Sequence, residues 1–185
     1  KAYKPENKSI VSGQVLQCPY DFQKARLVVR EMADALALDL VDKGLVTNQL
    51  VLTVGYDREN LDDPSRAVRY KGPVTADRYG RKIPKHAVGT ENFSYTSSAN
   101  DLLKAVTALY ERIVDKNLLI RRLSISANKL LDEASTSKEE PAEQLDLFTD
   151  YAAKEQQEQA DKAAHARERK LQEAMLGIKK RYGKN

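Results

Sequence analysis

Two segments of the sequence carry an apolar residue at every third or fourth position, and each lies between segments that resemble β-strands. The first follows Asp21, a good N-cap residue, and ends before Gly44, which suits the position just past a helix. The second begins at Ser98, and Asp101 three residues later completes a pattern that resembles a capping box. Each helix therefore has one apolar stripe to bury. The stripes consist of Ala25, Val28, Val29, Met32, Leu36 and Leu40, and of Leu102, Val106, Leu109, Tyr110 and Ile113.

Four segments around these helices have the composition and alternation of β-strands. They are residues 8–17, 49–56, 87–98 and 118–128. We expect Pro19 to end the first strand, because proline cannot donate to a sheet ladder. The order is β-α-β-β-α-β, which predicts an α+β fold: a four-stranded, mainly antiparallel sheet with two helices on one face.

The other face of this sheet has no helix to cover it. Alternation places Arg122, Ser124 and Ser126 on that open face if the residues between them face the core. Arg121 then shares the parity of the core residues, so we expect its side chain to reach toward an edge, with its stem over apolar surface. In a regular strand at most one of the two neighbouring arginines can point away from the helices, a limit that a bulge or a place near the sheet edge would relax. Such a face suits water or a polar partner.

Residues 57–86 separate the second and third strands and show no periodicity. They contain Pro64, Pro73 and Pro84, more basic than acidic residues, and two interleaved tyrosines, Tyr70 and Tyr79. A loop of this length inside a compact domain is commonly functional or disordered. We expect it to be irregular, and mobile when the chain is isolated.

Charge divides the chain into three parts. The net charge is +6 over residues 1–131, −6 over 132–150 and +4 over 151–185. We interpret these parts as a folded domain, a flexible acidic tether and a charged helical tail. In the tail, apolar periodicity is poor until Leu171, Met175 and Ile178, which predicts a solvated helix that docks at most by its end. A basic body is compatible with a polyanionic partner and equally with an ordinary solvated surface.

Several kinds of chemistry have no signature in the sequence. His86 and His165 lie far apart, the single Cys18 precedes a proline, and no glycine-rich phosphate loop is present. Asp62 and Asp63 lie in the irregular loop, where solvation explains them. We therefore expect no catalytic residue, metal or cofactor in this chain. The single cysteine and the absence of a long apolar run favour an intracellular protein without a membrane span. The first residue is not Met, so we expect a piece of a longer protein.

A cluster of large apolar residues lies in the acidic tether. Leu145, Leu147 and Phe148 follow Gln144 there. They could dock on the body as a satellite cluster, or they could be a ligand for another protein. An extended segment can insert Leu147 and Phe148 into an apolar pocket while Gln144 forms hydrogen bonds at the pocket's edge. Few contacts and an ordering cost predict micromolar affinity, about −8 kcal/mol.

Three stretches resemble a known family. "KSIVSGQVL" and "IRRLSISANKL" resemble the C-terminal DNA-binding domain, the little finger, of Y-family translesion DNA polymerases, and the element order agrees. "KPENKSI" lies where that family's tether from the thumb enters the first strand. "QLDLF" at 144–148 matches the bacterial sliding-clamp-binding pentapeptide at all five positions. The resemblance covers residues 5–148 and favours the UmuC-like branch of Gram-positive bacteria, where a long insert between the second and third strands also occurs.

This resemblance implies a module that binds primer–template DNA by its backbone, without reading bases, and tethers an error-prone polymerase to the sliding clamp. It implies that magnesium belongs to the palm of the parent enzyme, and that this segment is not catalytic. The parent would act in DNA damage tolerance, repair and the SOS response, in the cytoplasm at the nucleoid. The implied clamp-binding residues are Gln144, Leu145, Asp146, Leu147 and Phe148.

The DNA-binding residues that we expect are basic or hydroxyl-bearing and come from the open face and the loop. They are Lys8, Ser9, Arg78, Arg81, Lys82, Lys85, Arg121, Arg122, Ser124 and Ser126. The structural alternative for Arg121 and Arg122 is a pair of ordinary strand-surface arginines. The alternative for the whole chain is a clamp-binding adaptor that uses the same pentapeptide and whose body binds a protein instead of DNA. The salt dependence of DNA binding separates the two, because phosphate contacts release counterions.

Overall fold

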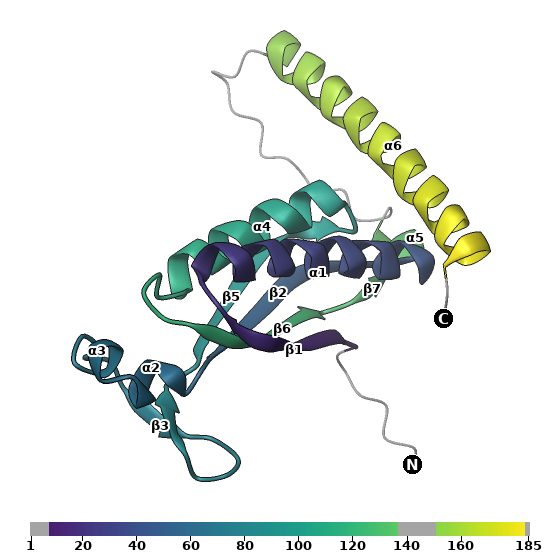
Figure 1. The fold of residues 1–185 in the computed structure, drawn as a ribbon. Coiled ribbons are helices and arrows are strands. Elements are labelled where there is room, and N and C mark those ends of the chain that lie inside the picture. The colour runs from purple at the N-terminus through teal and green to yellow at the C-terminus, as the bar shows by residue number, and fades with distance from the viewer. Residues whose placement is uncertain (1–7, 137–150, 184–185) are drawn as a thin grey trace, which may run out of the picture.

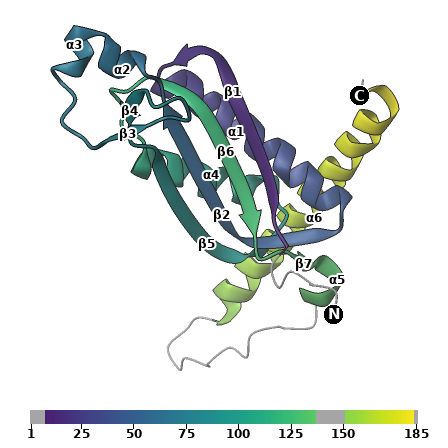
Figure 2. The same ribbon diagram turned by 90° about the horizontal axis from the view of Figure 1, so that it is seen from below.

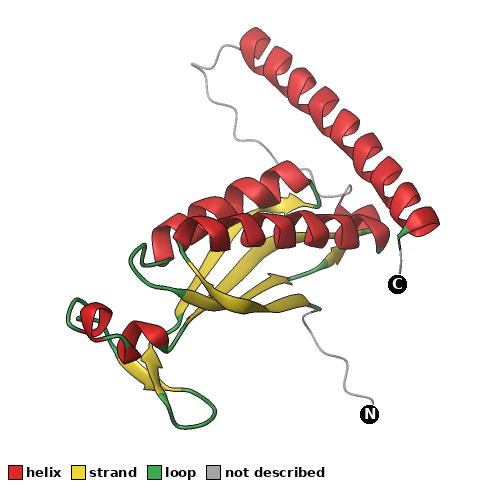
Figure 3. Ribbon diagram, in the orientation of Figure 1, coloured by secondary structure: helices red, strands yellow, loops and turns green. Residues whose placement is uncertain are grey.

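The structure, a computed structural model, describes residues 8–136 and 151–183. Its centre is an antiparallel sheet with the strand order β1 (Ile10–Tyr20), β6 (Ile120–Asn128), β2 (Leu45–Tyr56) and β5 (Ala87–Thr96). The short β7 (Leu131–Asp132) pairs with the start of β2. Two helices, α1 (Phe22–Asp42) and α4 (Ala99–Ile113), lie side by side over one face (Figures 1 and 3). The predicted α+β architecture and element order are confirmed.

The residues predicted to bound the two helices do so. The Asp21 carboxylate accepts a backbone N–H of the first turn of α1 at 2.8 Å, and Gly44 has a φ of 63° just past the helix end. The Ser98 hydroxyl accepts the Asp101 N–H at 3.2 Å at the start of α4. The Asp101 carboxylate accepts from the Thr96 hydroxyl at 3.0 Å, and Thr96 Oγ1 in turn accepts the Ser98 N–H. The capping box is therefore closed through a third residue.

The core lies between the sheet and these two helices. The rings of Phe22 and Tyr110 are 4.8 Å apart, and the Tyr110 hydroxyl donates to the Phe22 carbonyl at 2.8 Å. Burial raises the pKa of the Tyr110 phenol far above its usual value. Val28 and Ile113 of the predicted stripes are only half-buried. The fully buried residues include Ala25, Leu40, Leu50, Leu52, Val54, Leu102, Val106, Leu109, Leu123 and Ala127.

The first strand is longer than predicted. We expected Pro19 to end it, but β1 continues through Pro19 to Tyr20, which pairs with Ile120. That expectation was wrong because β1 is an edge strand, and a proline at an edge removes no ladder hydrogen bond. The pairing with β6 nevertheless breaks between Val15 and Tyr20.

The C-terminal helix α6 (Tyr151–Tyr182) is mostly exposed, as predicted, but it docks by other residues than expected. Leu171, Met175 and Ile178 are 61%, 46% and 61% exposed. The contacts come from a neighbouring side of the helix, where Gln172 is buried. The apolar spacing therefore identified the helix, but it did not identify the docked face.

Polar groups in the middle of α6 form most of its hydrogen bonds to the rest of the described chain. The Glu168 carboxylate accepts from the Ser98 hydroxyl and from the Asn100 N–H, each at 2.8 Å, at the positive N-terminal end of α4. Arg169 pairs at 2.9 Å with Glu133, the first residue of α5 (Glu133–Thr136). Docking therefore depends on ion pairs and hydrogen bonds, which apolar periodicity does not reveal.

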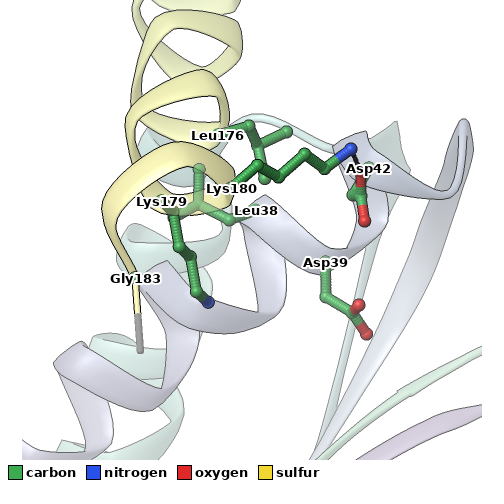
Figure 4. A pocket seen from close by; sticks show the side chains of 7 residues that line it. All are labelled: Leu38, Asp39, Asp42, Leu176, Lys179, Lys180 and Gly183. Carbon is green, nitrogen blue, oxygen red and sulfur yellow. Dashed lines mark ion pairs between the residues drawn. The ribbon is translucent and has the colours of Figure 1, made fainter. Parts of the chain in front are cut away.

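The end of α6 contacts the end of α1, as Figure 4 shows. Leu176 lies beside Leu38, and Lys180 forms an ion pair with Asp42. A cation in the last turn of α6 and an acid at the end of α1 hold the two helices together at this point. The helix thus contacts both the end of α1 and the start of α4.

Residues 57–86 fold into an insertion and are not the irregular loop that we expected. The insertion contains α2 (Glu59–Asp62), α3 (Pro64–Ala67) and a hairpin of β3 (Val74–Ala76) and β4 (Lys82–Pro84). It lies at one end of the sheet, away from α6 (Figures 1 and 2). These elements have three or four residues each, so they are too short to show a periodicity.

A single buried amide anchors the insertion to the sheet. Asn60 is 0% exposed, and its Nδ2 donates to the carbonyls of Asp57 and Leu119 at 2.8 Å each. Its Oδ1 accepts the Leu119 N–H, also at 2.8 Å. The side chain therefore forms a backbone-like pair with the residue that precedes β6. A fully satisfied polar group of this kind fixes one local arrangement.

We expect Asn60→Ala to lower the free energy of unfolding by about 1–3 kcal/mol, the cost of one buried donor left without a partner. Both carbonyls keep another donor, because the Asp57 N–H donates to Leu119 and the Asn60 N–H to Asp57. Only the Leu119 N–H is orphaned. Urea unfolding measures the change. Asn100→Ala, the same substitution at an exposed helical position, is the control and should cost less than about 0.5 kcal/mol. Equal effects of the two substitutions would contradict the anchor.

Candidate nucleic-acid interface

Figure 2 views the molecule from the side of the sheet opposite the helices. Strand register places small, polar and β-branched side chains on this face. Register places Ser124 and Ser126 there, opposite Thr53 and Val51 of β2. The predicted orientation of this face is confirmed, since Leu123 and Ile125 between these residues are buried. The face consists of Val11, Gly13, Val15, Gln49, Val51, Thr53, Gly55, Val88, Thr90, Asn92, Arg122, Ser124, Ser126 and Asn128. No acidic residue is among them, so an anion can approach without repulsion from this face.

A β-bulge changes the face at its end near the insertion. Gly55 pairs with Arg122 and Tyr56 with Ile120, so Arg121 has no partner on β2. Ile120 and Leu123 are both buried, and the two residues between them both lie outside the core. The prediction that Arg121 has core-side parity was therefore wrong, because an inserted residue resets the alternation. The bulge lets both arginines line the same groove.

The two arginines differ in what holds them. Arg121 Nη1 donates to the Gln17 carbonyl at 2.9 Å, and its Nε lies 3.8 Å from Asp57. Arg122 lies beside Gly55, where an added Cβ would come within 3.2 Å of the Arg122 Cβ. A glycine at this position therefore leaves the space that the Arg122 side chain needs. Arg121 supports the irregular edge, whereas Arg122 is free to bind a ligand.

A groove of about 940 Å³ lies between this end of the face and the insertion. Its walls are β-strand residues such as Val15 and Val88 on one side and the β3–β4 hairpin on the other. The charged residues that line it are Arg58, Arg78, Arg81, Lys85, Arg121 and Arg122, against Asp57 and Asp77. Basic residues outnumber acidic residues in the lining of the groove, and the groove is open to solvent. Its chemistry suits an extended anion.

Half of these cations already have an acidic partner. Arg81 pairs with Asp77 at 2.6 Å, Arg58 with Asp62 at 3.3 Å, and Arg121 lies near Asp57. The other three, Arg78, Lys85 and Arg122, have no ion pair with the described residues. A cation without an acidic partner can use all its N–H donors in charge-assisted hydrogen bonds to phosphate oxygens.

The hairpin turn that holds Arg78 is built around one carboxylate. Asp77 accepts the N–H groups of Tyr79 and Arg81 at 2.8 and 2.9 Å, and the Arg81 Nε at 2.7 Å. Gly80 follows with a φ of 75° and donates its N–H to the Asp77 carbonyl. The hydrogen bond from the Arg81 side chain, above all, lowers the pKa of Asp77, and the two backbone N–H groups add to it. The turn therefore has a defined shape.

The structure brings together half of the residues that we predicted for DNA. Arg78, Arg81, Lys85, Arg121 and Arg122 line the groove. Ser124 and Ser126 continue from it along the open face. Lys8 and Ser9 precede β1 at the opposite end of the sheet, and Lys82 lies on β4 outside the groove lining. The predicted clamp-binding residues 144–148 lie outside the described residues.

Sequence reasoning missed Arg58 and His86, which both line the groove. A signal for them existed. Each lies one or two residues beyond the predicted end of a strand, 49–56 or 87–98, and antiparallel pairing brings those ends to the same edge. In residues 8–136 and 151–183, no group of three or more His, Cys, Asp or Glu could hold a metal ion. None of the helices in these ranges is long and apolar enough to cross a membrane.

Comparison with family models identifies the family of this chain. A family model described as the impB/mucB/samB family C-terminal domain matches residues 7–147. The chain therefore belongs to this family and is a C-terminal domain of the Y-family polymerase type. No curated protein matches the chain.

One similar solved structure is described as a complex of the beta-clamp processivity factor and the little finger domain of PolIV. The match covers 77% of this chain and 100% of the other, with a TM-score of 0.43 and 9% sequence identity. A likeness this distant supports no argument about the partners of the present chain.

We predict that the Asp77 carboxyl titrates with a midpoint below 3.8, because the Arg81 guanidinium stabilises its ionised form. A lowered pKa means that the carboxylate stabilises the turn above the ordinary Asp value and that this support is lost as the pH falls through the lowered midpoint. Carboxyl carbon shifts in NMR spectra measure the midpoint. Arg81→Ala should move it toward 3.8, whereas Arg78→Ala, which removes a charge from the same turn but no hydrogen bond to Asp77, should leave it lowered. A midpoint at or above 3.8 in the parent contradicts the prediction.

Proposed function

We propose that this chain is the DNA-binding and clamp-tethering region of a translesion polymerase. Its groove and open face bind primer–template DNA by the phosphate backbone, without sequence specificity. The observation that carries this proposal is a set of three cations, Arg78, Lys85 and Arg122, that form no ion pair with the described residues and lie at the edge of a sheet face without acids. A polymerase that copies damaged templates must hold DNA by groups that damage does not alter, and the backbone is such a group.

The arrangement fits backbone contacts better than base readout. Serine, threonine and amide side chains on a flat face can donate to phosphate oxygens over several positions. Base readout needs an element that enters a groove of the duplex, and the open face presents short side chains. Three phosphate contacts predict a slope of about −3 for log affinity against log salt. An adaptor whose body binds protein would show no such slope with DNA.

The second part of the proposal is a clamp-binding segment at Gln144, Leu145, Asp146, Leu147 and Phe148. Its support is the match of all five residues to the bacterial clamp-binding pentapeptide and their place in the acidic stretch of residues 132–150. Leu147 and Phe148 would fill an apolar pocket on the clamp, and Gln144 would form hydrogen bonds at its edge. Weak binding suits a polymerase that must be exchanged after a lesion.

We further propose a division of labour within the chain and its parent. Residues 1–131 bind DNA, 132–150 tether the clamp, and 151–185 form a helical tail. The segment is not catalytic and needs no cofactor, because catalysis and magnesium belong to the palm of a parent polymerase. The folded insertion between β2 and β5 supports the UmuC-like branch of Gram-positive bacteria, whose members carry a long insert there.

Replacement of Arg122 by Ala should weaken duplex DNA binding about equally for all sequences and reduce the salt slope by roughly one unit. Fluorescence anisotropy at several salt concentrations measures both quantities. Arg30→Ala is the matched control, because Arg30 is exposed on α1 on the helical side. We expect the control to keep the parent slope. If the Arg122 variant binds like the parent at low salt, the open face is not the DNA surface.

Replacement of Leu147 and Phe148 by Ala should abolish binding to a bacterial sliding clamp and leave duplex DNA binding unchanged. Calorimetry with the purified clamp, where the parent should bind at about micromolar Kd, tests this. Leu171→Ala with Ile178→Ala on α6 is the control, since it removes two equally large exposed apolar side chains outside the pentapeptide. Retained affinity in the Leu147/Phe148 variant overturns the clamp assignment.

A further inference from the structure

The tip of the β3–β4 hairpin presents an aromatic ring to solvent beside the groove. Tyr79 lines the groove and is 75% exposed, more than any other large hydrophobic residue among the described side chains. An aromatic side chain on a hairpin tip loses hydrophobic stabilisation by staying in water. A single exposed ring is ordinary on a protein surface, so the groups around Tyr79 decide whether it has a ligand.

One side of the Tyr79 ring is already occupied by a cation. The Arg81 guanidinium carbon lies 5.0 Å from the ring centroid, and Asp77 holds that guanidinium by an ion pair of 2.6 Å. The same carboxylate accepts the backbone N–H of Tyr79 at 2.8 Å. Both the backbone and one side of the ring are thus fixed before any ligand arrives, which lowers the entropy cost of binding.

The chemistry around the ring points to a nucleotide. Arg78, next to Tyr79, and Lys85, on the same groove wall, have no ion pair with the described residues. Proteins that bind single-stranded nucleic acid combine aromatic rings, on which bases stack, with cations that contact the phosphates. Stacking of this kind accepts any base. A protein partner would favour an apolar surround, but the turn residues beside Tyr79 are Arg78, Gly80 and Arg81.

We propose that Tyr79 is a stacking platform for an unpaired base of the single-stranded template next to the duplex. This inference rests on the proposed function, since it assumes that the groove and open face hold primer–template DNA. The base stacks on the ring face away from Arg81, and Arg78 and Lys85 contact the flanking phosphates. The insertion thereby extends the binding surface from duplex to single strand.

The test compares two ligands with the 185-residue chain: a blunt duplex, and the same duplex with a template overhang that carries 2-aminopurine. Tyr79→Ala should weaken overhang binding by about 5- to 150-fold, the range expected for one stacked base, and weaken blunt-duplex binding by a much smaller factor. It should also abolish the stacking-induced quenching of 2-aminopurine fluorescence. Tyr79→Phe should keep both the overhang affinity and the quenching, because the ring remains. Tyr95→Ala is the control, because Tyr95 is an exposed tyrosine on β5 outside the groove lining.

The outcomes separate this inference from the proposed function. If the parent shows salt-dependent duplex binding but Tyr79→Ala binds the overhang as the parent does, the platform is overturned and the proposed function stands. An equal loss for both ligands also overturns it, because Tyr79 would then only shape the groove. If the parent binds neither ligand, the proposed function fails and the platform fails with it. If Tyr79 instead contacts another domain of the full-length polymerase, Tyr79→Ala will bind the overhang as the unsubstituted chain does, and the platform is overturned.

Discussion

Burial of one sheet face beneath α1 and α4 is the constraint on which the rest of the structure depends. The apolar stripes of the two helices cover Leu50, Leu52 and Val54 of β2 and their neighbours on β6, and the Tyr110–Phe22 contact joins the helices. Because a strand has period two, every residue buried on this side fixes a neighbour on the other. The open face is therefore a consequence of the core. Its serines and threonines can be selected for a ligand without any cost to packing.

The β-bulge at Arg121 adds what alternation alone cannot provide. A regular β6 would turn one of two consecutive arginines into the core side, where a charge is costly. With one extra residue opposite Gly55 and Tyr56, both arginines stay outside, and they take different tasks. Arg121 contacts both the Gln17 carbonyl and Asp57, whereas Arg122 forms no ion pair within the described part of the chain. Bulges commonly lie beside functional sites for this reason, since they re-aim side chains without a change in the core.

The sequence predicts the parts of the fold that depend on period and caps. The helices after Asp21 and Ser98, the order of elements along the chain and the buried face of the sheet all follow from such patterns, and the structure confirms them. The bulge, the insertion and the docking of α6 do not follow, because each depends on single polar contacts. The partner of the Asn60 side chain is Leu119, and a partner of the Glu168 carboxylate is Asn100. Both partners are distant in the sequence and are adjacent only in the folded chain. The sequence therefore predicted which types of residue line the candidate site, but only half of the particular residues that it predicted line the groove.

These single contacts also decide whether the groove can act as one site. The hairpin that carries Arg78 belongs to the insertion between β2 and β5, whereas Arg122 lies on β6. The Asn60 side chain fixes the start of the insertion to the residue just before β6. The backbone N–H of Asp57 donates to the same Leu119 carbonyl at 2.9 Å. The two walls of the groove thus share an anchor within two residues of Arg121. Cations held at fixed separations lose little entropy when they bind a phosphate backbone, which is itself regularly spaced. A loose loop with the same charges would attract DNA, but it could not set the position of the template.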